Sequence, residues 1–200
     1  MRALVRHQLS AFLALGLLAS VGSLPQETQT GALQLELVRD ADAQSLRPLF
    51  KVEMHNKTPR PLILYLGWNV GGKNYAGEVK FSLTDESGRT RHLVKRDPMY
   101  VAGSIGLYIV TIPGGGAFEL PSIDLEDYWS YEPKIADLEL LPGCYSLSAE
   151  YTGHNPYDDF TPAPGQPAAR QYPQNFWIGA VHSSVMTFTL TSRIGDTNPH

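Results

Sequence analysis

The feature that most constrains this chain is a tight turn followed directly by a strand of strict alternation, in residues 141–151. Successive side chains of a β-strand point to opposite faces, so a half-buried strand needs apolar residues at every second position. The apolar positions here are Tyr145, Leu147, Ala149 and Tyr151. The residues between them are Ser146, Ser148 and Glu150. A strand of this kind buries one face against another layer, which predicts a fold of packed sheets.

Similar short strands recur along the chain and are separated by turn signals. The predicted strands cover residues 33–37, 50–55, 62–68, 79–83, 90–95, 107–112 and 186–190, with further strand material between 118 and 125. The turn signals are Gly71-Gly72, residues 85–88 and residues 113–116, and we expect residues 126–133 to form one helical turn. Many short strands with frequent turns predict an all-β, antiparallel β-sandwich with a long loop before the last strand. We expect residues 143–151 to pair antiparallel with residues 185–192.

Pro142, Gly143 and Tyr145 form a pattern of turn followed by tyrosine that resembles the tyrosine corner of immunoglobulin-like sandwiches. These three residues are therefore interpreted as structural. The resemblance implies that Tyr145 is buried at the start of a strand. It also implies that its hydroxyl donates a hydrogen bond to backbone a few residues upstream.

The order of motifs along the chain resembles that of bacterial immunoglobulin-like domains of the intracellular proteinase inhibitor type. The matching segments are residues 50–56, 61–64, 81–88, 112–115 and 141–145. The likeness spans roughly residues 48–151 and implies an immunoglobulin-like antiparallel β-sandwich. None of the matched positions carries an inhibitory residue over to this chain. Residues 177–185 are similar to the start of the C-terminal strand in exported bacterial proteins of unassigned function.

The N-terminal residues have the pattern of an export signal. Arg2 and Arg6 precede an apolar run at 11–21 that is too short to span a bilayer, and small residues follow at 21–23. We expect a signal peptide at 1–23, a flexible segment at 24–32, the sandwich at 33–192 and a flexible tail at 193–200. Cleavage leaves 14 basic and 20 acidic residues and a net charge of −6. This predicts a secreted or periplasmic protein that binds no nucleic acid and does not insert into a membrane.

Cysteine and histidine spacing gives no indication of a cofactor or a metal site. Cys144 is the single cysteine, which excludes an intramolecular disulfide but leaves pairing between chains open. The histidines of the domain, His55, His92, His154 and His182, show none of the short spacings that are typical of metal sites.

Candidates for catalysis are few. Ser104 lies in a near match to the G-x-S-x-G elbow, but β-rich sequence follows it where that motif requires a helix. The acidic pairs Glu126-Asp127 and Asp158-Asp159 lack the spacing of a calcium loop, and neighbouring residues of a strand face opposite sides. Asn56 begins an N-x-T glycosylation pattern.

The long segment at 152–182 is the main candidate for binding. It contains five prolines and the candidate binding residues Tyr157, Phe160, Tyr172, Phe176 and Trp177. Long loops of this composition suit a binding surface, because aromatic side chains offer large contact area at small entropic cost. The alternative is that the aromatic side chains fold back and cover an open end or edge of the sandwich.

These observations predict an exported, non-catalytic interaction module that binds a protein or another extracellular ligand through residues 152–182. The alternative is a proteinase inhibitor that presents a proline-braced loop, either Pro113-Gly114-Gly115 or residues 161–173. The weaker alternative is a hydrolase that uses Ser104 or the acidic pairs.

Overall fold

The structure, a computed structural model, describes residues 31–40, 49–96, 104–131, 134–158 and 175–191. Within these ranges the chain forms antiparallel strands joined by turns, with one short 3-10 turn at Leu125–Asp127. This confirms the predicted all-β class. The predicted signal peptide and the predicted tail at 193–200 lie outside the described residues.

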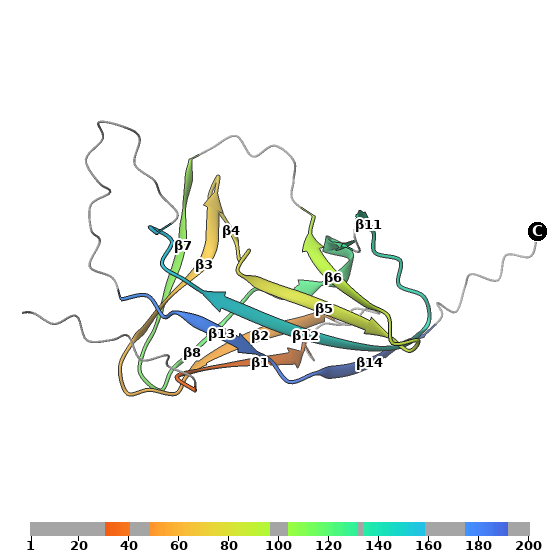
Figure 1. Cartoon of the computed structure of the whole chain (residues 1–200), viewed down its shortest axis with the longest axis horizontal. Helices are drawn as coiled ribbons and strands as arrows, with labels where there is room; N and C mark the ends of the chain where they lie inside the picture. The colour runs from red at the N-terminus through yellow and green to blue at the C-terminus, as the bar shows by residue number, and fades with distance from the viewer. Residues whose placement is uncertain (1–30, 41–48, 97–103, 132–133, 159–174, 192–200) are drawn as a thin grey trace, which may run out of the picture.

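The strands form three sheets (Figure 1). The first has the order β1–β2–β8, with β9 also paired to β2, and consists of β1 (Leu33–Arg39), β2 (Leu49–Asn56), β8 (Ala117–Glu119) and β9 (Ile123–Asp124). The second has the order β11–β10–β6–β5–β12–β13, with β14 also paired to β12, and consists of β5 (Val79–Asp85), β6 (Thr90–Lys95), β10 (Tyr128–Tyr131), β11 (Ile135–Asp137), β12 (Gly143–Gly153), β13 (Gly179–His182) and β14 (Met186–Leu190). The third has the order β4–β3–β7 and consists of β3 (Leu62–Val70), β4 (Lys73–Tyr75) and β7 (Ile105–Ile112).

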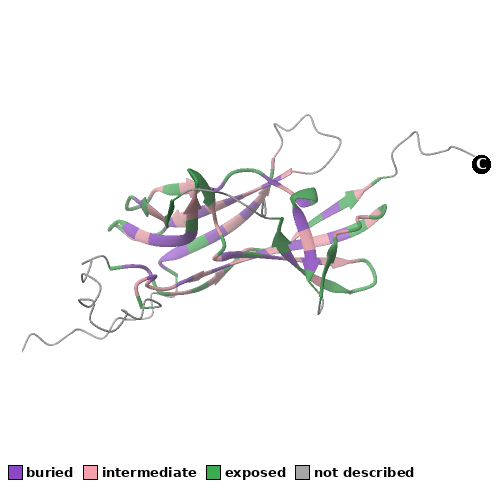
Figure 2. Cartoon of the chain, turned by 90° about the horizontal axis from the view of Figure 1, so that it is seen from above, coloured by how far each residue is buried: buried purple, intermediate pink, exposed green. Residues whose placement is uncertain are grey.

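The core lies between the first and second sheets and extends to the third. The ring of Phe50 in β2 lies 5.0 Å from that of Phe188 in β14, across the two layers. The Tyr151 hydroxyl of β12 donates to the Tyr65 carbonyl of β3 at 3.0 Å, which ties the second sheet to the third. Buried and more exposed residues alternate along the strands (Figure 2), as the period of two requires.

Strand β12 confirms the alternation and the turn that precedes it. Tyr145 is buried, and its hydroxyl donates to the Leu141 carbonyl at 2.8 Å, as the sequence predicts. β12 pairs antiparallel with β14, with Tyr145 opposite Phe188 and their rings stacked at 5.6 Å. This is the expected partner strand. The finer relationship to immunoglobulin-like domains stays a prediction.

A buried asparagine joins the first and third sheets. Asn56 ends β2, where the chain turns toward β3, and the return from β7 to β8 passes beside it. Its side-chain amide donates to the carbonyls of Arg60, Ile112 and Pro113 at 2.7, 3.0 and 3.0 Å. Its Oδ1 accepts from the backbone N–H and the hydroxyl of Thr58 at 2.9 and 2.8 Å. With its amide buried and fully used, Asn56 offers no site for a glycan.

Several predicted details need correction. The predicted helical turn is confined to Leu125–Asp127, and the residues after it form β10, which pairs with β6. Gly71 and Gly72 form the predicted turn after β3, but this turn leads into β4, a strand that the sequence did not indicate. Ala32 is buried and its carbonyl accepts from Lys57, so it belongs to the domain and not to the flexible segment.

The predicted long loop is also shorter than expected. β12 runs to Gly153, and β13 returns to pair with its last residues, with Gly153 opposite Gly179. The segment between them therefore begins and ends at neighbouring points of the second sheet.

Candidate functional site

A cleft of about 400 Å³ opens between the layers, at a place that the sequence analysis did not indicate. One wall comes from the second sheet and the other from the connection between β8 and β9, with β7 and the β4–β5 turn at the side. Its lining residues are Asn74, Tyr75, Ala76, Gly77, Val79, Lys80, Phe81, His92, Leu93, Val94, Lys95, Tyr108, Leu120, Pro121, Ser122, Ile123 and Tyr128. Clefts of this size with mainly apolar walls are typical of small-molecule sites.

The cleft is more basic than the chain around it. The sequence carries a net charge of −4, yet the described lining contains two lysines and one histidine and no carboxylate. Alternation along β5 and β6 places Lys80 and His92 on the outer face of the second sheet. Lys95 shares the inner face with the buried Leu93. Lys95 is therefore the cation on the cleft's own side of the sheet.

Three tyrosines line the same cleft as this lysine, and they are Tyr75, Tyr108 and Tyr128. The Lys95 Nζ lies 5.9 Å from the ring centroid of Tyr75, within reach of a cation–π interaction. Tyr128 stands opposite Lys95 in the β6–β10 register. Burial, with a smaller contribution from the charge of Asp127, raises the pKa of Tyr128 to about 12. Burial also raises the pKa of Tyr108. Both phenols are therefore neutral near pH 7, and Lys95 supplies the positive charge.

The two ends of the predicted binding segment are fixed to the core. The Trp177 backbone N–H donates to the Ile63 carbonyl at 2.9 Å, and Phe176 forms a parallel bridge with Ile63. The Trp177 ring stacks on Tyr151 with centroids 5.6 Å apart, and the Phe176 ring lies 6.1 Å from that of Tyr157. These contacts close the end of the sandwich between β3 and β12.

Two of the five predicted binding residues are therefore buried in the structure. Phe176 and Trp177 are 3% and 5% exposed, so they serve as the cover that the sequence left as the alternative. The reason is that Tyr151 and Ile63 offer them an apolar surface that the sequence does not reveal. Tyr157 is half-buried, while Phe160 and Tyr172 lie outside the described residues.

The candidate catalytic residues that the structure describes lie in turns or next to strands. Ser104 is exposed and leads directly into β7, so the strand-to-helix turn that activates a nucleophile elbow is missing there. Glu126 and Asp127 are exposed within the 3-10 turn, which Asp124 caps by accepting from the Glu126 N–H. Asp158 accepts from the Asn155 side chain at 3.0 Å, and Asp159 lies outside the described residues.

The remaining candidates are a turn and a thiol. Residues 113–116 form a tight turn whose Gly115 N–H donates to Thr58 at 2.9 Å. A Cβ added at Gly114 would clash with the Pro59 carbonyl oxygen, so the turn packs closely on the neighbouring corner. Residues 161–173 lie outside the described residues. Cys144 is exposed beside Thr189, on the outer face that alternation predicts.

No known protein-family model matches this sequence, and a search of curated proteins likewise finds no match. Within the described ranges, none of the structure is a helix long and apolar enough to cross a bilayer.

Proposed function

We propose that this protein is an exported, non-catalytic binding module whose cleft takes an apolar molecule carrying one anionic group. The observation that carries the proposal is the cleft itself, which combines apolar and aromatic walls with the ammonium of Lys95 and no lining carboxylate. Apolar walls favour an apolar ligand body, and one charged group fixes its orientation. The acidic remainder of the chain disfavours anions elsewhere, which adds to the selectivity of the cleft.

The proposed binding site lies in the space between the layers, whereas the sequence analysis placed it at residues 152–182. The described ends of that segment support the fold, since Phe176 and Trp177 are buried. Protease inhibition stays a prediction from the family resemblance, and a panel of proteases is its direct test.

Two related fluorescent probes test the proposal. 1-Anilinonaphthalene-8-sulfonate is apolar and anionic, while N-phenyl-1-naphthylamine has the same aromatic body without the sulfonate. We expect the folded protein to bind both probes with one site per chain and to bind the anionic probe more tightly. Lys95→Met keeps an apolar side chain of similar length and removes the charge. This substitution should weaken binding of the sulfonate probe about three- to tenfold, as expected for a partly exposed ion pair of about 0.6–1.4 kcal/mol. It should leave the affinity for the neutral probe unchanged.

Lys134→Met is the matched control, because Lys134 is exposed and does not line the cleft. It should change neither affinity. Near-UV circular dichroism on each variant establishes that the probes report on the native fold. The proposal would be contradicted if Lys95→Met lost affinity for both probes equally. It would also be contradicted if both variants lost affinity for the sulfonate probe equally.

A further inference from the structure

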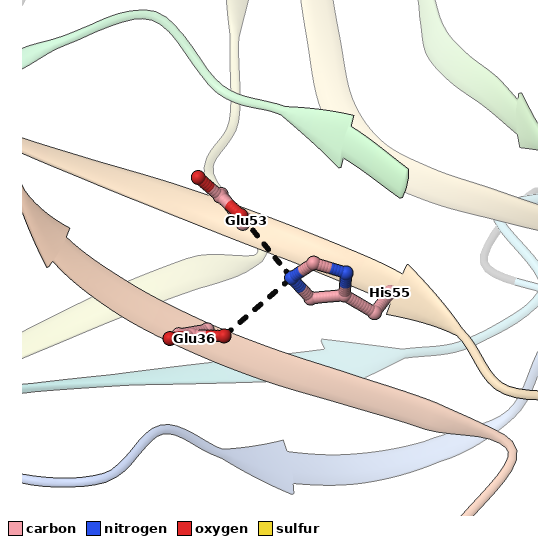
Figure 3. Close-up of side chains that lie close together, drawn as sticks. All are labelled: Glu36, Glu53 and His55. Atoms are coloured by element: carbon pink, nitrogen blue, oxygen red, sulfur yellow. Dashed lines mark ion pairs between the residues drawn. The ribbon is translucent and has the colours of Figure 1, made fainter. Parts of the chain in front are cut away.

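Three side chains capable of metal binding meet on the outer face of the first sheet (Figure 3). Glu53 and His55 are two residues apart in β2, so alternation places them on the same face. Glu36 comes from β1, where the register sets it directly opposite Glu53. One ligand atom from each residue lies within 4.8 Å of the other two.

The imidazole points between the two carboxylates. The His55 Nε2 lies 3.2 Å from a Glu53 oxygen and 3.6 Å from a Glu36 oxygen. This nitrogen is buried and makes no hydrogen bond. A carboxylate offers lone pairs and no proton, so a neutral Nε2 lone pair would face only other lone pairs. Either a proton on Nε2, which the ring can carry in a neutral tautomer, or a metal cation between the three groups is needed to hold this arrangement.

The distances from the imidazole nitrogen to the two carboxylates fit a metal ion. Zinc binds imidazole nitrogen and carboxylate oxygen at about 2.0–2.2 Å, so two ligands at a tetrahedral angle are about 3.3–3.5 Å apart. The separations of 3.2 and 3.6 Å bracket that value.

The row of carboxylates across the first sheet also favours a bound cation. Glu53 stands opposite Glu36 on one side and opposite Glu119 on the other. Like charges at such positions are destabilising. Lys51 neutralises one end of this row, since its Nζ lies 3.2 Å from Glu119. Glu36 and Glu53 then share the imidazole of His55 as their neighbour. The three side chains together carry a net negative charge when this ring is neutral.

We infer that Glu36, Glu53 and His55 form a binding site for a divalent transition metal ion, with Zn²⁺ as the best-fitting probe. Three protein ligands leave a coordination position open to solvent, since the Glu36 side chain is 47% exposed. The imidazole favours a transition metal over Ca²⁺, which takes oxygen ligands. The site lies apart from the cleft and shares no residue with it.

The experiment is a calorimetric titration of the purified, chelator-treated protein with Zn²⁺, repeated with Co²⁺ to follow its visible absorption. We expect one ion per chain. His55→Gln and Glu36→Gln should each weaken binding by at least about tenfold, because each removes one of three ligands. Zn²⁺ should also raise the melting temperature of the wild type and not that of Glu36→Gln.

His182→Gln is the matched control. His182 also lies near a carboxylate, with its Nδ1 3.9 Å from Glu150, but it belongs to no group of three metal-binding residues in the described chain. This variant should bind Zn²⁺ like the wild type. The proposal is overturned if the wild type binds no Zn²⁺, if His182→Gln loses as much affinity as His55→Gln, or if Glu36→Gln binds unchanged. The first of these results would assign the cluster to an Nε2 proton of His55 that faces the two carboxylates.

Discussion

Asn56→Ala should be among the most destabilising single substitutions in this domain. The side chain is 1% exposed and serves three backbone carbonyls and the two donors of Thr58. Its two amide hydrogens are shared among the three carbonyls, so the substitution removes about four effective hydrogen bonds at about 1 kcal/mol each. Some of the groups left behind are buried and cannot all reach water. We expect the free energy of unfolding to fall by about 3–5 kcal/mol.

Urea denaturation followed by tryptophan fluorescence measures this change. With a slope of about 2 kcal/mol/M, the midpoint should move down by about 2 M. Lys57→Ala alters the exposed neighbouring side chain and should change stability by less than about 0.5 kcal/mol. Thr58→Val removes one hydroxyl from the same network and should give an intermediate loss of about 1 kcal/mol. A loss below about 1 kcal/mol for Asn56→Ala would show that the corner between β2 and β3 is not held by this side chain.

Tyr145→Phe removes one hydrogen bond to an exposed residue's carbonyl and should cost about 0.5–1.5 kcal/mol in urea denaturation. Burial raises the pKa of both Tyr128 and Tyr151, so their neutral forms are favoured in the folded state. This stability is fully present below the unfolded pKa near 10 and is lost as pH rises through the folded values, by about 1.4 kcal/mol per pH unit and phenol. Gly153→Ala should lower the melting temperature by several degrees, because the new Cβ would lie 2.5 Å from a ring carbon of Trp177.

Each of these outcomes has a direct check. Gly77→Ala is the control for the glycine substitution, since no atom lies within 4 Å of its added Cβ. An unchanged melting temperature for Gly153→Ala would mean that the tryptophan ring is not seated as described. Absorbance at 295 nm follows phenol ionisation, and titration of all ten tyrosines near pH 10 in the folded protein would contradict the alkaline prediction. Unchanged stability of Tyr145→Phe would show that the hydrogen bond from Tyr145 to the Leu141 carbonyl does not stabilise the fold.

The local sequence was sufficient for most of the strands and for the turn that begins β12. Alternation has a period of two, so residues such as Leu147 and Ala149 show which face is buried without knowledge of the partner strand. The turn before Tyr145 and the hairpin at 85–88 depend on residues close in sequence, and the structure confirms both. The short strands β4 and β11 were missed because three residues are too few to display a period.

The tertiary structure alone decided which residues meet across strands and layers. Spacing places Glu53 and His55 on one face, but the register of β1 brings Glu36 to them. The cleft combines residues spread between Asn74 and Tyr128 on several strands and connections, so no local pattern marks it. Trp177 lies in a segment whose composition suits binding. It is part of the core because its ring stacks on the ring of Tyr151. Backbone alternation is local and can be read along the chain, whereas register and packing depend on partners far away in it.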